Sequence, residues 1–396
     1  MLMRTVQNQK NLKTNNLKLV LDIIRDRKEV PLSRADIAKI TQMSATSITR
    51  ITDYLIHSGL VEQVDTVGKG TVGRNGIGLQ VIRDSIVTAG ISIDSDYIDV
   101  CLLDFWDEVM GQRKETLAKR PYTPEEILKI ARKLFDGLCS DLGFVPEIVS
   151  AVGISCIGNI DYKTGTIFFA PQFQWNQVEL GKLAKMYFTQ QVYVENDMKS
   201  SIVGLSRRDQ DLKHENITYL SIGMGVGAAV MYDGVIMRGS NNAAGEVGHI
   251  IVEAEGRACD CGQRGCVQTY LTKNSLIEIC GEKGHPVEDV QEIYEAYRKG
   301  SPWAAAFVDK TVDHLAVLMR NLVYMYDTRY LLVGGAIISD FPEMFTLAKG
   351  KLKDLMHSNL YSNLRLKCVM EKYNSMIGAA FVAQENSLEQ CGDGNG

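Results

Sequence analysis

The spacing of apolar residues changes once along the chain, near residue 85, and this change limits the fold more than any other feature. Up to about residue 60 the spacing is mainly helical, with apolar residues three and four positions apart. After residue 85, short apolar runs typical of strands alternate with helical segments, starting with a predicted hairpin over 86–93 and 97–103. That alternation is typical of an α/β architecture. Because 396 residues suffice for two or three globular units, we predict a small head followed by an α/β body.

The head has the residue pattern of a helix-turn-helix domain. Ser33 is followed three residues later by Asp36, which is the spacing of a capping box, so a short helix is predicted over 34–40. Ser44 opens the next helix, which the apolar spacing extends to about residue 57. Two such helices joined by a tight turn form the motif whose second helix enters the major groove of DNA.

Small, hydroxyl and basic side chains occupy the face of this second helix opposite its apolar stripe, and such a face suits base contacts. Two strands, predicted over 60–64 and 76–81, enclose a loop rich in glycine and basic residues, and this hairpin is the predicted wing. The expected DNA contacts are Ser33, Arg34, Ser44, Ala45, Thr46, Ser47, Thr49, Arg50, Lys69 and Arg74. A helical domain that binds another protein is the alternative interpretation.

The distribution of charge supports the DNA-binding interpretation. Residues 1–80 carry twelve lysines and arginines against seven aspartates and glutamates, a net charge of +5, whereas the whole chain carries −5. The remainder therefore carries −10. A basic head on an acidic body is expected where a nucleic-acid-binding module is joined to a domain of another function.

The most specific chemical pattern is a cluster of metal-ligating residues. Cys259, Cys261 and Cys266 lie within eight residues of one another, and His249 precedes them. One imidazole and three thiolates match a tetrahedral structural zinc site, and the glycines between the cysteines permit tight turns. Three reduced thiols in a loop beside an unrelated histidine are the alternative. Clustered cysteines in a chain of this length favour a metal over a disulfide framework.

The segments AAGEVGH, CDCG and RGC around these ligands resemble the signature of the ROK family, and GNIDYKTG, VENDMKSSIVG and LVGGAI match further family blocks. The head resembles that of the family's repressors, including its xylose- and N-acetylglucosamine-responsive members. In the wing, Gly73-Arg74-Asn75 stands where the family usually has Gly-Arg-Pro. The resemblance implies a two-lobed, actin-like (ribonuclease H-like) sugar-kinase body with zinc beside the sugar.

By this resemblance, five residues occupy the positions that contact sugar hydroxyls. Carboxylates, amides and imidazoles supply the paired donors and acceptors that a polyol requires. Gln268 stands where the family usually has glutamate, which removes a charge and leaves open a different sugar or weaker binding. Without the family context, a turn or a helix cap is the favoured interpretation of Asn196 and Asp197. The expected sugar contacts are Asn196, Asp197, Glu246, His249 and Gln268.

The phosphate-binding motif of the family's kinases is altered here. Those kinases have Asp-x-Gly-Gly-Thr between the first two strands, and its glycines let backbone N–H groups approach ATP. The corresponding residues are Ser92 to Asp96, which lack both glycines and add the carboxylates of Asp94 and Asp96. In the second phosphate loop Met224 replaces the usual threonine. We therefore expect neither ATP binding nor enzymatic activity.

These features together predict a DNA-binding transcriptional repressor of sugar-utilisation genes that is released by a sugar. It is expected to contain a structural Zn²⁺ ion and to bind a palindromic operator as a homodimer or dimer of dimers. The alternatives are an active sugar kinase, a repressor controlled by a protein partner, and an activator. The expected domains are a winged helix-turn-helix over 1–82, a smaller lobe over 83–197 with about 375–396, and a larger lobe over 198–374 with the zinc site and the dimer interface.

The sequence also predicts where the protein works. It has no apolar stretch long enough to span a membrane, and its first residues lack the apolar core of a signal peptide. We therefore expect a cytoplasmic protein without a membrane partner.

Overall fold

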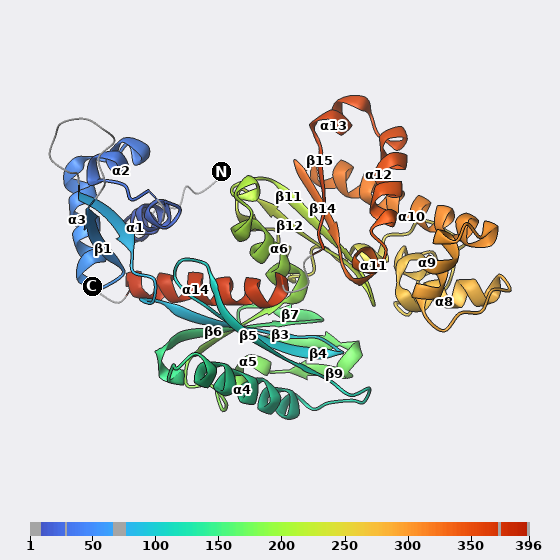
Figure 1. Cartoon of the computed structure of the whole chain (residues 1–396), viewed down its shortest axis with the longest axis horizontal. Helices are drawn as coiled ribbons and strands as arrows, with labels where there is room; N and C mark the ends of the chain where they lie inside the picture. The colour runs from blue at the N-terminus through green and yellow to red at the C-terminus, as the bar shows by residue number, and fades with distance from the viewer. Residues whose placement is uncertain (1–8, 28–29, 66–76, 371–373, 394–396) are drawn as a thin grey trace, which may run out of the picture. The chain divides into compact units, whose positions relative to one another are not determined.

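The chain forms two compact units in the computed structural model (Figure 1). The residues that the structure describes are 9–27, 30–65, 77–370 and 374–393. Unit 1 contains the described residues up to Cys156, together with Lys163–Glu195 and the chain from Ala379 onward. Unit 2 contains Ile157–Tyr162 and Asn196–Gly378. The predicted α/β architecture is confirmed, because two five-stranded sheets with flanking helices make up the body.

Three helices and a hairpin form the head at the start of unit 1, and the sequence predicts the second and third helices and the hairpin. These elements are α1 (Gln9–Arg25), α2 (Arg34–Thr41), α3 (Ala45–His57), β1 (Val61–Asp65) and β2 (Ile77–Val81). The two strands pair antiparallel, with Val61 opposite Val81. The tip of the predicted wing, with Lys69 and Arg74, lies outside the described residues.

Local signals account for the tight turn between α2 and α3. The Ser33 hydroxyl accepts the backbone N–H of Asp36, and the Asp36 carboxylate accepts the backbone N–H of Ser33, so the predicted capping box is confirmed. Gln42 takes a left-handed conformation (φ 58°) at the end of α2, and Ser44 caps α3. Ile48 is completely buried, which turns the opposite face of α3 toward solvent.

The head is fixed to the rest of unit 1 by a shared core. Leu21 of α1 belongs to the same buried cluster as Phe105, in the turn after β4, and Leu388 of the C-terminal helix α14 (Asn374–Asp393). Arg25 is only 3% exposed, and its Nη1 donates to Gln384 Oε1 of α14 at 2.9 Å. Because a buried guanidinium needs such partners, this contact ties α1 to α14.

The five-stranded sheet of unit 1 has the strand order β10-β6-β3-β4-β5. Its strands are β3 (Val87–Ile93), β4 (Tyr97–Leu103), β5 (Val109–Thr116), β6 (Val149–Cys156) and β10 (Gln191–Asn196). The predicted hairpin is confirmed, since β3 and β4 are antiparallel, and β3 and β6 are parallel. A second hairpin joins β8 (Thr166–Ala170) and β9 (Trp175–Val178), and α5 (Leu180–Ala184) follows it.

Helix α4 (Pro124–Asp141) covers one face of this sheet and buries Ile127, Leu134 and Phe135.

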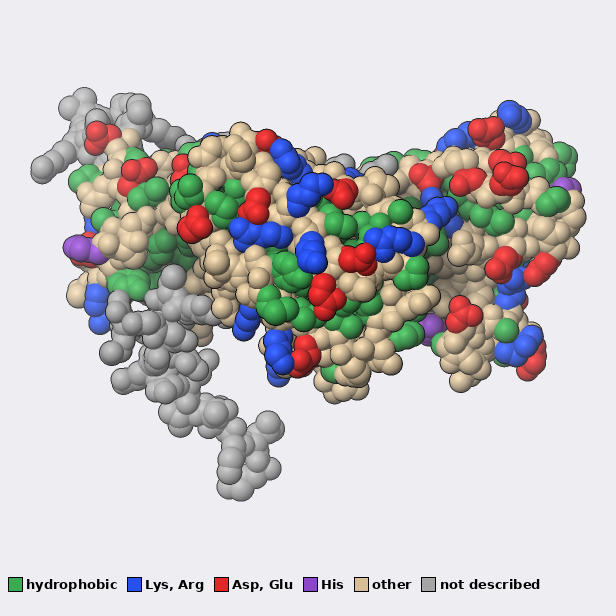
Figure 2. Space-filling view, turned by 90° about the horizontal axis from the view of Figure 1, so that it is seen from below, with side chains coloured by type: hydrophobic (Ala, Val, Ile, Leu, Met, Phe, Trp, Pro, Cys, Tyr) green, Lys and Arg blue, Asp and Glu red, His purple; other side chains and the backbone are tan. Residues whose placement is uncertain are grey.

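Basic and acidic side chains are interspersed on the surface of the molecule seen in Figure 2. Within unit 1, Arg120 and Glu126 form an ion pair with an N–O distance of 2.9 Å. This face therefore lacks the single-sign field that attracts a nucleic-acid backbone.

The sheet of unit 2 has the order β13-β12-β11-β14-β15. Its strands are β11 (Ile217–Ile222), β12 (Val226–Tyr232), β13 (Val235–Ile236), β14 (Tyr330–Gly334) and β15 (Arg365–Cys368). This unit also contains the short strand β7 (Asn159–Asp161) and the α-helices α6 (Asp197–Arg208), α7 (Gln268–Leu271), α8 (Lys273–Glu282), α9 (Val290–Arg298), α10 (Pro302–Tyr326), α11 (Ala336–Asp340), α12 (Glu343–Leu355) and α13 (Ser358–Asn363). Among the described residues, no helix is long and apolar enough to cross a membrane.

Candidate metal, sugar and DNA sites

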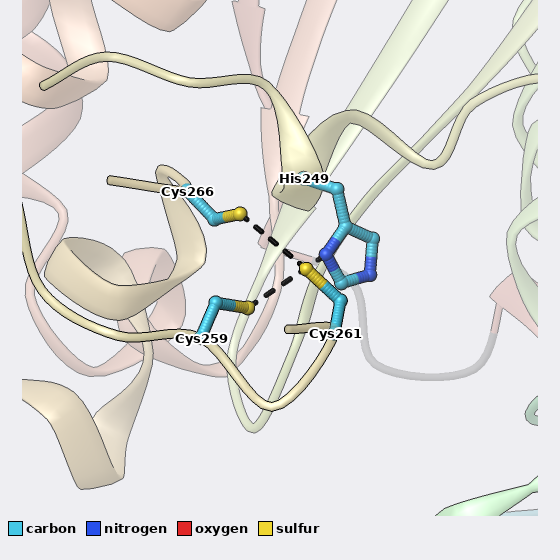
Figure 3. Close-up of side chains that lie close together, drawn as sticks. All are labelled: His249, Cys259, Cys261 and Cys266. Atoms are coloured by element: carbon cyan, nitrogen blue, oxygen red, sulfur yellow. Dashed lines mark hydrogen bonds between the residues drawn. The ribbon is translucent and has the colours of Figure 1, made fainter. Parts of the chain in front are cut away.

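The four predicted metal ligands converge in unit 2 (Figure 3). One ligand atom from each of His249, Cys259, Cys261 and Cys266 lies within 4.8 Å of all the others. Cys259 Sγ is 3.8 Å from His249 Nδ1, and the Sγ atoms of Cys261 and Cys266 are 3.6 Å apart. A tetrahedral zinc ion with Zn–S distances of about 2.3 Å places its ligand atoms about 3.5–3.8 Å apart. This donor set therefore fits zinc.

Glycine at two positions allows the cysteine loop to close. Gly262 and Gly265 have φ values of 88° and 74°, which side chains other than glycine rarely adopt. A Cβ atom at Gly265 would lie 1.6 Å from the backbone oxygen of Glu253, so no side chain fits there. The backbone N–H of Cys259 donates to Gln263 O at 2.9 Å and closes the turn. These glycines are the ones from which the sequence predicts tight turns.

Two thiols of the loop have pKa values shifted in opposite directions. Burial raises the pKa of Cys266 to about 12, whereas a backbone hydrogen bond from Gln263 lowers the pKa of Cys261. A bound divalent cation deprotonates the thiols that coordinate it. The loop is therefore chemically suited to take up a metal with release of protons.

A polar cluster braces the loop from α10. The Tyr270 hydroxyl donates to Glu253 Oε2 at 3.1 Å and accepts the backbone N–H of Arg257 at 2.9 Å. His314 Nε2 lies 3.0 Å from Glu253 Oε1, and its ring stacks on Tyr270 with the centroids 4.4 Å apart. The hydrogen bond with His314 lowers the pKa of Glu253. This support was not predicted, because His314 is remote in sequence from the cysteines.

Gln268, the first residue of α7, lies against the metal ligands. Its Nε2 donates to Cys259 Sγ at 3.2 Å. The Gln268 Oε1 end lies beside Gly248, where an added Cβ would be 2.9 Å from that oxygen. Gln268 was predicted to contact a sugar, and its bond to a metal ligand was not anticipated from the sequence.

Asn196 caps α6 and also holds its neighbour. Its Oδ1 accepts the backbone N–H groups of Met198 and Lys199 at 3.0 and 3.2 Å. Its Nδ2 donates to Gly158 O at 3.0 Å and to Asp197 Oδ1 at 2.8 Å. The helix-cap interpretation is thus confirmed for Asn196, and the same bonds fix the carboxylate of Asp197.

A buried lysine anchors the loop that leads to Glu246. Lys199 is 3% exposed, and its Nζ donates to Asn242 O at 2.8 Å. Asn242 Nδ2 in turn donates to Ile160 O at 2.7 Å. Sequence reasoning missed Lys199 and Asn242; the only signal for the lysine is its position two residues after Asp197 on the buried face of α6.

Glu246 immediately precedes a short 3₁₀ turn over Val247–His249, and His249 is its last residue. Gly245, just before it, has a φ of 102°, and a Cβ there would lie 1.9 Å from Ala228 O. The imidazole of His249 turns Nδ1 toward the thiols, and Nε2 lies on the other edge of the ring (Figure 3). One histidine can therefore bind a metal through Nδ1 and a hydroxyl group through Nε2.

The turn between β3 and β4 is acidic, in the position of the kinase phosphate motif. The Ser95 hydroxyl donates to Asp94 Oδ1 at 3.1 Å, and burial raises the pKa of Asp94. Asp99 of β4 is only 2% exposed, and burial raises its pKa to about 7. It stands in register between Ser92 of β3 and Lys114 of β5. Burial therefore favours the neutral form of Asp99 up to about neutral pH.

One open hollow on the head is formed by α3. Ala45, Thr46, Thr49, Arg50 and Asp53 line it. These are the residues predicted to face away from the apolar stripe, and the first four are exposed to solvent.

The other predicted DNA contacts within the described head also have structural roles. Arg34 donates to Thr52 Oγ1 at 2.9 Å and to Asp53 Oδ1 at 2.7 Å, and these bonds brace α2 against α3. The Ser44 hydroxyl caps α3 and lies 2.9 Å from Ser47 Oγ. Ser33 takes part in the capping box of α2.

Comparison with known proteins gives a consistent picture. A family model described as ROK family matches residues 88–386. The chain is 28% identical over 347 residues to a xylose repressor of Caldicellulosiruptor bescii, covering 84% of this chain and 86% of that protein. A solved ROK family transcriptional regulator, a homolog of the E. coli MLC protein, has a TM-score of 0.80 at 21% identity and covers 96% of this chain and 98% of its own. A ROK hexokinase from Thermus thermophilus has a TM-score of 0.67 at 19% identity and covers 76% of this chain and 99% of its own.

Proposed function

The chain belongs to the ROK family, and from this premise we propose that it is a DNA-binding transcriptional repressor of sugar-utilisation genes. Its body binds a sugar without transferring phosphate. The observation that carries the proposal is the presence of a helix-turn-helix head in front of the ROK body. The similarity to the transcriptional regulator covers 96% of the chain, against 76% for the hexokinase.

DNA recognition is assigned to α3. Its N-terminal residues Ala45, Thr46 and Thr49 and the guanidinium of Arg50 point away from the head's core, as base-reading side chains of a helix-turn-helix do. Ser33, Arg34, Ser44 and Ser47 flank this face and are suited to phosphate contacts. Lys69 and Arg74 remain proposed contacts of the wing. Two copies of the chain, as a homodimer, would read the two halves of a palindromic operator.

Sugar binding is assigned to residues of unit 2. Asp197 is held by Asn196, Glu246 follows the loop anchored by Lys199, and His249 offers Nε2. With Gln268 they supply carboxylate, amide and imidazole groups, which suit a polyol with vicinal hydroxyls.

The cysteine loop is assigned to a structural zinc ion. His249, Cys259, Cys261 and Cys266 would hold the ion, and four protein ligands leave no open position for catalysis. When bound, the ion supplies rigidity to the turn that carries Glu246 and His249.

Phosphoryl transfer is not assigned to this chain. By the resemblance, the turn with Asp94 and Asp96 stands where the family's kinases have the glycines of their backbone phosphate cradle. Asp197 is retained, and we assign it to sugar binding because a base that activates a hydroxyl is of no use without a positioned phosphoryl donor.

In the proposed mechanism, the sugar binds more tightly to the conformation of the body in which the two heads no longer match the operator. The occupied protein then leaves the DNA by a shift in population. A sugar that binds both conformations equally would not release it.

DNA binding is tested with the full chain. The operator is selected from a random pool of double-stranded DNA, and its affinity is measured by fluorescence anisotropy at one fixed salt concentration. We expect Arg50→Ala to weaken binding of the selected site by about 1–3 kcal/mol. The matched control is Arg365→Ala, which removes an exposed arginine of β15 in unit 2 and should leave affinity unchanged. Equal affinity of wild type and Arg50→Ala would contradict the assignment of α3.

Sugar sensing is tested by a thermal-shift screen of the same protein against pentoses, hexoses, N-acetylated hexosamines and short oligosaccharides, with ATP as a separate condition. A sugar at about 100 times its Kd stabilises the folded protein by about 2.7 kcal/mol. The stabilising sugar should also release the operator. Stabilisation by ATP with turnover of a sugar would instead establish a kinase, and release by none of the sugars would favour control by a protein partner.

A further inference from the structure

Gln268 makes a contact that the proposed sugar-binding role does not explain. Its Nε2 lies 3.2 Å from Cys259 Sγ, within the range of an N–H···S hydrogen bond. Among the residues that the structure describes, it is the one side chain outside the four ligands found hydrogen-bonded to a ligand sulfur. Cys259 is buried, and the bond is partly buried.

The bond fixes which end of the carboxamide faces the metal loop. A thiolate is an acceptor only, so it selects the N–H end of Gln268. The Oε1 end then lies beside Gly248, where an added Cβ would meet it at 2.9 Å. Gly248 lies between Glu246 and His249 in the 3₁₀ turn. The side chain of Gln268 thus joins the cysteine loop to the turn that carries two of the proposed sugar contacts.

An amide at position 268 supplies a hydrogen-bond donor that a carboxylate lacks. Three thiolates, a neutral imidazole and a divalent cation carry a net charge of −1, and N–H groups directed at the sulfurs stabilise that charge. A carboxylate at position 268 would have no proton to donate and would add a second negative charge. Groups that hydrogen-bond metal ligands change metal affinity by about 10–100-fold when they are removed.

We propose that Gln268 is a positioning residue of the metal centre, whose Nε2–H donates to the Cys259 thiolate and strengthens metal binding. The same bond leaves a ligand only the neutral acceptor Oε1 of this side chain. The inference rests on the metal site of the proposed function, but it needs neither sugar nor DNA to be tested.

The test is competition for Zn²⁺ between the full chain, prepared metal-free under reducing conditions, and a chromophoric chelator at neutral pH. We expect both Gln268→Ala and Gln268→Glu, which remove the N–H donor, to bind zinc about 10-fold more weakly. Gln263→Glu is the matched control, since it adds the same charge within the cysteine loop at an exposed side chain. The zinc affinity of this control should stay within about twofold of wild type, because Gln263→Glu keeps the hydrogen bond from Gln268 to Cys259.

A second measurement separates this role from a general loss of structure. With Co²⁺ in place of Zn²⁺, the thiolate-to-metal charge-transfer band should shift in Gln268→Ala and not in Gln263→Glu, at unchanged circular dichroism. Equal zinc affinities of wild type, Gln268→Ala and Gln268→Glu would overturn the proposal, as would failure of the wild type to bind zinc. Loss of operator or sugar binding would refute the repressor function and leave this result unaffected.

Discussion

Replacing Asp99 by asparagine should remove a pH dependence of the free energy of unfolding that arises from burial of this carboxyl group in the sheet of unit 1. Asp99 is 2% exposed, and no hydrogen-bond partner is found for its Oδ1. Burial raises its pKa from 3.8 to about 7, against the opposing charge of Lys114 and with a smaller contribution from Asp94. The neutral form of this carboxyl group is therefore the one that fits the folded protein up to about neutral pH.

The direction of the pH dependence follows from the number of protons that the folded and the unfolded state bind. Between pH 4 and 7 the folded state keeps a proton on Asp99 that the unfolded state releases, so the free energy of unfolding falls as the pH rises. A difference of about three pKa units corresponds to about 4 kcal/mol over the whole window. Between pH 5 and pH 8, Asp99 lowers the free energy of unfolding by about 3 kcal/mol, which corresponds to roughly 6–12 °C in melting temperature.

Asp99→Asn stays neutral at every pH and keeps nearly the same shape. Measured by differential scanning fluorimetry at pH 5 and pH 8, it should gain stability relative to wild type as the pH rises. Asp96→Asn removes a carboxylate from the exposed end of the same turn and controls for pH effects elsewhere. If Asp99→Asn and wild type lose the same stability between these pH values, burial does not set the protonation of Asp99 and the reasoning fails.

Three further perturbations test other parts of the structure. Gly265→Ala, whose Cβ would lie 1.6 Å from Glu253 O, should destabilise the cysteine loop by more than about 1 kcal/mol and lower the zinc content measured by emission spectrometry. Arg25→Met leaves the buried Oε1 of Gln384 without its donor and should cost about 1–3 kcal/mol, seen as faster hydrogen exchange in α1 while α10 is unchanged. Chelation of the metal should lower the melting temperature of wild type, whereas Cys261→Ser should melt at the same temperature with and without chelator.

Features that depend on neighbouring residues were predictable from the sequence. The capping box of Ser33 and Asp36 and the apolar stripe of α3 are set within one or two helical turns, and the structure confirms both. The metal ligands were equally visible, because three of the four lie within eight residues and glycines mark the turns between them. Such patterns need no knowledge of which strands pair.

Features that depend on distant pairing were not predictable. The bond from Lys199 to Asn242 joins residues 43 positions apart, and that from Asn242 to Ile160 spans 82. β5 was not predicted either, since its GQRKET segment has polar residues on both faces and lacks the alternation of a half-buried strand. The orientation of Gln268 toward Cys259 follows only from the folded loop, so sequence reasoning assigned it to the sugar alone.

The proposed sugar site at Asp197 and the turn between β3 and β4 differ in their polar groups. This contrast supports the proposal that the body binds a sugar without transferring phosphate to it. Around Asp197 the polar groups are tied by hydrogen bonds from Asn196, which is the preorganisation that recognition of a polyol needs. Around the β3–β4 turn the acidic groups accumulate instead, and Asp99 is buried at a cost of about 4 kcal/mol once it ionises. A phosphate beside this turn would meet carboxyl groups where it needs N–H donors. The proposed sensor would hold its ligand unchanged, which reversible release of an operator requires.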